Sequence, residues 1–83
     1  MSEAEFSVYQ FAEDGRYVRE LSFVTDRTAV VMAMSLARSA AGRVGLIRRI
    51  IITDGGDFTV FEWKFGEGVT YPVDTTKAHP ARH

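Results

Sequence analysis

The chain of 83 residues contains no cysteine. This absence excludes disulfide bonds, thiolate metal sites and a cysteine nucleophile. The only histidines, His79 and His83, flank Pro80, which disfavours a helix-borne metal pair. The longest apolar run, residues 29–34, is too short to span a bilayer, and the acidic start has no signal-peptide core. We therefore expect a cytoplasmic protein with no membrane contact, no metal site and no other cofactor.

An excess of charge of one sign is also lacking. Lysine and arginine number 10, aspartate and glutamate number 11, and the formal net charge is -1. No global field therefore draws the chain to nucleic acid or to an anionic membrane. The length suits one small core. We predict a single domain over residues 1–72 and a mobile tail over 73–83, where few side chains can be buried.

The first half begins with a predicted hairpin over residues 5–24. Two β-rich runs flank Asp14 and Gly15, a strong short-range turn signal. A two-residue turn there would place Phe6 opposite Phe23. A turn with a glycine bulge would slip the register by one residue and exchange part of the faces. We favour the first register because its cross-strand pairs match better.

The clearest element is a helix predicted over residues 25–43. Thr25 or Asp26 can cap its N-terminus, and we expect Gly42 to end it. Its apolar residues fall on one side and include several alanines, so the helix axis can lie close to a sheet.

A second hairpin is predicted from residues 44–53 and 58–65, joined by the Asp-Gly-Gly-Asp sequence at 54–57. This register pairs Arg49 with Glu62, and the adjacent glycines would supply the positive φ angles of a tight turn. Calcium loops need more oxygens at alternating positions, and phosphate loops lead into a helix rather than a strand. We therefore interpret residues 54–57 as a turn rather than a metal or phosphate site.

The order of elements predicts an α+β fold of ββαββ type: a single four-stranded, mostly antiparallel sheet with one helix packed on one face. The strand order stays open. Large apolar residues are expected on both faces of the sheet, and a domain of this size is marginal alone. We therefore predict a homodimer formed through the face without a helix; the alternative is that the segment around residues 69–73 folds back over that face. The predicted interface residues are Tyr9, Phe11, Val18, Ile47, Arg49, Ile51, Val60 and Glu62.

The predicted role is structural or protein-interacting, through self-association. One alternative is binding of single-stranded nucleic acid or a small ligand on the open face, although the net charge and the missing aromatic motif disfavour nucleic acid. Another is binding of a different protein. A third is a small enzyme with Glu20, Glu62 and Arg49 at the dimer interface. Since no histidine or cysteine lies in the domain, we favour a non-enzymatic role and predict no catalytic residue. The pattern is typical of short bacterial proteins, which by itself assigns no activity.

Overall fold

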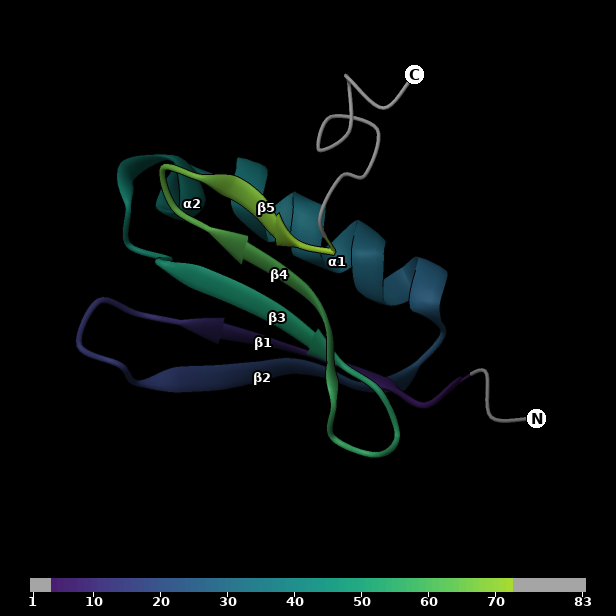
Figure 1. Ribbon diagram of the computed structural model, residues 1–83. Coiled ribbons are helices and arrows are strands. Elements are labelled where there is room, and N and C mark those ends of the chain that lie inside the picture. The colour runs from purple at the N-terminus through teal and green to yellow at the C-terminus, as the bar shows by residue number, and fades with distance from the viewer. Residues whose placement is uncertain (1–3, 73–83) are drawn as a thin grey trace, which may run out of the picture.

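A computed structural model describes residues 4–72 of the chain, so the predicted tail lies outside the described residues (Figure 1). The elements in chain order are β1 (Phe6–Phe11), β2 (Tyr17–Val24), α1 (Asp26–Arg38), α2 (Ala40–Val44), β3 (Arg49–Thr53), β4 (Thr59–Lys64) and β5 (Gly68–Tyr71). The predicted α+β fold of ββαββ order is confirmed, with one strand more than expected. The extra strand β5 forms because the chain reverses at Gly66, which has a φ of 85°.

The five strands form one open antiparallel sheet in the order β2-β1-β3-β4-β5. The strand β1 therefore lies inside the sheet and pairs with both β2 and β3. The helix α1 packs against β1 and β3, and less extensively against β2, on one side of the sheet. Figure 1 shows both helices on this same side.

The helix α1 begins at the predicted cap, because the Thr25 hydroxyl accepts a hydrogen bond of 3.2 Å from the Thr28 amide. It ends earlier than predicted. Ser39 adopts an extended conformation (φ -66°, ψ 165°) and separates α1 from the short helix α2. The expected stop at Gly42 is wrong, since Gly42 lies within α2, and Gly45 ends that helix with a φ of 91°. One predicted helix is therefore two.

The core lies between α1 and the sheet. Ala29 and Ala33 are completely buried there, which confirms that the alanine stripe brings the helix close to the strands. The buried core residues are Val8, Ala29, Ala33, Ile47, Ile50, Ile52 and Trp63. Ile47 is only 4% exposed. Its predicted position on the open face is thus corrected: it follows α2 and packs into the core before β3 begins.

The first hairpin follows the glycine-bulge register beside its turn, where Phe11 pairs with Tyr17. Gly15 has the positive φ of 89° that this turn requires. Farther from the turn β2 contains two extra residues relative to β1. After the first, Val8 pairs with Leu21, as the favoured register predicts; after the second, Phe6 pairs with Val24 instead of the predicted Phe23. Phe23 sits in the left-handed region (φ 55°) and is 71% exposed. The bulges therefore leave Phe23 in solvent rather than opposite Phe6.

Residues 54–57 form the predicted turn of the second hairpin, but the register of its two strands differs from the predicted one. Arg49 pairs with Lys64 instead of the predicted Glu62, a shift of two positions, so the assignment of strand faces near the centre is preserved. The Asp54 carboxylate accepts hydrogen bonds from the amides of Gly56 (2.9 Å) and Phe58 (3.0 Å). The positive φ in this turn belongs to Asp57 (66°) and not to the glycines. An aspartate side chain therefore organises this loop.

Candidate functional site on the open sheet face

The candidate site is the sheet face opposite the helices, here named the open face. Cross-strand pairing assigns its residues, because directly opposed residues share a face. They are Ser7, Tyr9, Phe11, Tyr17, Arg19, Arg49, Ile51, Thr53, Thr59, Glu62, Lys64 and Tyr71. Within residues 4–72 no helix lies over this face (Figure 1).

Five of the predicted interface residues lie together on the open face: Tyr9, Phe11, Arg49, Ile51 and Glu62. The other three do not. Ile47 belongs to the core, and Val60 packs against it. Val18 pairs with Gln10, whose other neighbour is the core residue Ile50, so Val18 points to the helix side. Irregular pairing in β2 and β4 explains the changes for Val18 and Val60, since an extra residue exchanges the two faces.

Three rings form an aromatic cluster on the open face: Tyr9, Phe11 and Tyr17. The Tyr17 ring lies 5.8 Å from Tyr9 and 5.5 Å from Phe11 between centroids, in tilted arrangements. Such distances and tilts are favourable for aromatic pairs. Tyr9 and Phe11 are half-buried, whereas Tyr17 is 62% exposed. The cluster therefore offers one accessible ring supported by two others.

Two arginines cover the supporting rings. The guanidinium carbon of Arg19 lies 5.6 Å from the Tyr9 ring centroid, and that of Arg49 lies 5.0 Å from Phe11. Both are within the range of cation–π contacts. The open face is consequently a mixed aromatic and cationic surface, less apolar than the sequence predicted. Its central Ile51 is already 91% covered by its neighbours, as it is only 9% exposed.

Arg49 also belongs to a polar network with Glu62 and Thr70. Its Nε lies 2.5 Å from Glu62 Oε2, and the Thr70 hydroxyl donates to Glu62 Oε1 at 2.7 Å. The Thr70 hydrogen bond, helped by Arg49, holds the pKa of Glu62 below its ordinary value despite partial burial. Glu62 is therefore an ionised acceptor with both oxygens engaged, which does not suit a proton-transferring base.

The carboxylates considered for an enzyme site are not brought together. The Gln10 amide donates to Glu20, and Gln10 belongs to the helix side of the sheet. Glu62 lies on the opposite face with Arg49. Within residues 4–72 no group of three or more His, Asp or Glu side chains could hold a metal ion.

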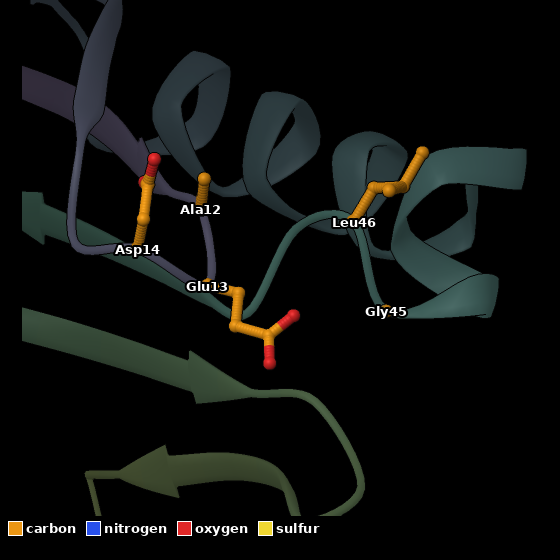
Figure 2. A pocket seen from close by; sticks show the side chains of 5 residues that line it. All are labelled: Ala12, Glu13, Asp14, Gly45 and Leu46. Atoms are coloured by element: carbon orange, nitrogen blue, oxygen red, sulfur yellow. The ribbon is translucent and has the colours of Figure 1, made fainter.

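A hollow of about 440 Å³ beside α1 is lined mainly by apolar residues, among them Phe6, Val30 and Val60. Two other hollows contain the carboxylates of Glu62 or of Glu13 and Asp14. One, of about 400 Å³, lies on the open face beside the Arg49–Glu62 pair and includes Thr70 and Tyr71. The other, of about 360 Å³, lies where the β1–β2 turn meets the segment after α2. Figure 2 shows the carboxylates of Glu13 and Asp14 pointing in different directions there. This hollow thus gathers no converging polar groups.

Comparison with protein-family models, curated proteins and solved structures finds no match to this chain. No helix in the described part of the chain is long and apolar enough to cross a membrane. The functional interpretation therefore rests on the open face.

Sequence reasoning missed several residues of this face, among them Tyr17, Arg19 and Thr70. Tyr17 carries a recognisable signal: the glycine-bulge register places it opposite Phe11. Thr70 carries none, because its contact with Glu62 depends on the pairing of β5 with β4, whereas the sequence indicates only a short extended segment there.

Proposed function

We propose that this protein self-associates as a homodimer through its open face, in a structural or protein-interaction role. The observation that supports the proposal is a five-stranded sheet with one face that no described element covers. The centre of this face combines Ile51 with Tyr9, Phe11 and Arg49. Tyrosine, phenylalanine and arginine are enriched at protein interfaces, and tyrosine and arginine dominate their binding energy.

The sheet edges are less suitable for association than the face. The edge strand β2 pairs irregularly with β1, with two shifts of register, and bulges bend an edge away from a partner strand. The other edge, β5, has only 4 residues. Both features oppose strand-to-strand addition, so contact between faces is the arrangement that the sheet favours.

The Arg49–Glu62 pair is compatible with burial in such a contact. Both charges have a partner within the same chain, at 2.5 Å. Covering them does not leave an unpaired charge, which would be the costly case. In a two-fold dimer each copy would present the same patch to the other.

The size of the face sets the expected strength. Strands spaced about 4.8 Å apart make this sheet about 19 Å wide, and a six-residue strand is about 20 Å long. The flat footprint is therefore about 400 Å², below the roughly 800 Å² of accessible surface per partner in a standard interface. Side-chain relief increases the accessible area, but we still expect a weak dimer with a dissociation constant in the micromolar range. The cytoplasmic location expected from the composition remains part of this proposal.

The test is light scattering or sedimentation across protein concentrations from about 1 to 500 µM, bracketing the expected affinity. The mean mass should rise to that of two chains as concentration increases. Tyr17→Glu, at an exposed position of the open face, should hold the protein as a monomer. Val31→Glu is the matched control, because Val31 is also 62% exposed but lies on α1, on the helix side.

Circular dichroism of each variant checks that the helices persist. A wild-type protein that stays monomeric over the whole range would refute the proposal. Equal weakening by Tyr17→Glu and Val31→Glu would also refute it, because association would then not depend on the open face.

A further inference from the structure

The open face carries a charge opposite to that of the whole chain. Its strand residues include three cationic side chains, Arg19, Arg49 and Lys64, and one carboxylate, Glu62. The formal net charge of these strand residues is thus +2, against -1 for the complete sequence. Of the nine acidic residues at positions 4–72, five lie in the connections between strands: Glu13, Asp14, Asp54, Asp57 and Glu67. The net charge of the complete sequence disfavours an anionic ligand, but the open face itself is positively charged.

The positive charges are interleaved with rings. Arg19 lies over Tyr9, Arg49 lies over Phe11, and Tyr17 contacts both rings. Aromatic side chains and guanidinium planes both stack on nucleic-acid bases, while cationic groups attract the phosphates. A sheet surface with both features can bind a flexible polyanion that carries planar groups. The planar groups stack on the rings, and the negative charges are attracted to the arginine and lysine side chains.

We propose that the open face binds single-stranded nucleic acid. The exposed Tyr17 ring provides the first stacking position, at the β2 side of the face. Arg19 and Lys64, on opposite sides of the aromatic cluster, attract phosphates. Arg49 donates its Nε to Glu62 and lies over Phe11, so it acts mainly as a stacking plane.

A single strand fits this face better than a duplex does. Bases must be unstacked from a partner strand before their flat surfaces can meet side-chain rings. In the described residues both helices lie on the opposite side of the sheet, so no helix projects from this face into a groove (Figure 1). The contacts involve base planes and phosphates rather than base edges, so we expect little sequence preference.

This proposal does not depend on the homodimer, but the two use one surface. A copy whose open face is occupied by a nucleic-acid strand cannot present that face to another copy. We therefore expect an oligonucleotide to convert dimers into monomeric complexes, which a mass measurement can detect.

The experiment measures fluorescence anisotropy of a labelled oligothymidylate and a labelled oligoadenylate RNA, each of about 12 nucleotides, within the range of known single-strand sites. Wild-type protein should bind both strands at low salt, more tightly than a duplex of the same length. Tyr17→Ala should weaken binding about ten-fold, the effect expected for loss of one stacking ring. Arg19→Gln should also weaken binding and reduce the slope of log K against log salt by about 0.7.

Arg38→Gln is the control for charge alone, since Arg38 is exposed at the end of α1 on the helix side. It should leave the affinity unchanged. Absence of binding at about 50 mM salt, tighter binding of the duplex, or equal losses in Tyr17→Ala and Arg38→Gln would each overturn the proposal. Light scattering without oligonucleotide tests the homodimer separately, so failure of either proposal is recognised without the other.

Discussion

Gly42 of α2 lies against the backbone of α1, and its replacement by alanine has two opposing effects on the free energy of unfolding. Glycine within a helix costs about 1 kcal/mol relative to alanine, so propensity alone predicts that Gly42→Ala stabilises the protein. The packing predicts the reverse. A Cβ at position 42 would lie 2.5 Å from the Ala37 carbonyl oxygen and would also collide with that of Leu36.

The size of the expected loss of stability depends on how little the two carbonyl groups of α1 can move. Both obstructing atoms belong to the backbone of α1, so no side-chain rotation relieves the contact, and α2 must move as a unit. Overpacking typically costs about 1–3 kcal/mol, and we take the upper part of that range because the collision involves two carbonyls. After subtraction of the propensity gain, the expected loss is about 2 kcal/mol. For a domain of this size that loss lowers the Tm by roughly 8–16 °C.

The assay is thermal unfolding followed by circular dichroism, with urea unfolding for the free energy. Ala40→Gly serves as the control, because Ala40 is exposed in the same helix. This change should lower the free energy of unfolding only by the difference in helix propensity, about 1 kcal/mol. If Gly42→Ala raises the Tm, or lowers it no more than Ala40→Gly does, the helices do not approach as described.

Three further predictions concern the second hairpin, each tested by urea unfolding of the variant. Because the folded-state pKa of Glu62 is lowered, its ionisation stabilises the fold above its ordinary value of 4.5 and this contribution is lost as pH falls through the lowered pKa. The stability difference between wild type and Glu62→Gln, from urea unfolding, should therefore be larger at pH 7 than at pH 3; a constant difference would contradict the proposed charge network. In the turn, Asp54→Ala should lower the free energy of unfolding by about 1–2 kcal/mol, because two backbone amides lose their hydrogen-bond acceptor. Asp57→Gly should be neutral or stabilising by up to about 1 kcal/mol, since Asp57 holds a positive φ; equal losses from both changes would argue against this turn geometry.

The sequence predicts the types and order of the central elements well because each has a strong local pattern. The alanine stripe identifies the buried side of α1, and Thr25 marks its start. Alternation within β3 places Ile50 and Ile52 on one face and Ile51 on the other. These assignments depend on spacing along the chain, which a single sequence displays directly.

Strand faces that depend on an extra residue in one strand cannot be predicted from this spacing. The bulges in β2 expose Phe23, and irregular pairing in β4 moves Val60 toward the core. Each extra residue exchanges the two faces, and its position is decided by packing between strands and helix rather than by local preference. The break at Ser39 has a local signal, since the Ser39 hydroxyl caps α2 by accepting a hydrogen bond of 3.1 Å from the Gly42 amide, but a serine on the polar side of a continuous helix looks the same in a single sequence.

Some residues of the candidate site could be predicted from the spacing along the chain, and others could not. Tyr9, Phe11 and Arg49 follow from simple alternation, and the structure places them together. The contribution of Arg19 depends on the bulged register, and the hydrogen bond from Thr70 depends on a strand that alternation alone did not predict. The composition of the open face is therefore a property of the assembled sheet.

The place of β1 between β2 and β3 has a consequence for how the molecule is made. The ladder from Ser7–Thr53 to Phe11–Arg49 is the junction at which two separate hairpins become one sheet. Both strands of the first hairpin and α1 are synthesised before β3, so this junction cannot form until Thr53 has been added. A chain divided between α2 and β3 would therefore yield two pieces that each hold half of the junction, suited to reassembly in trans.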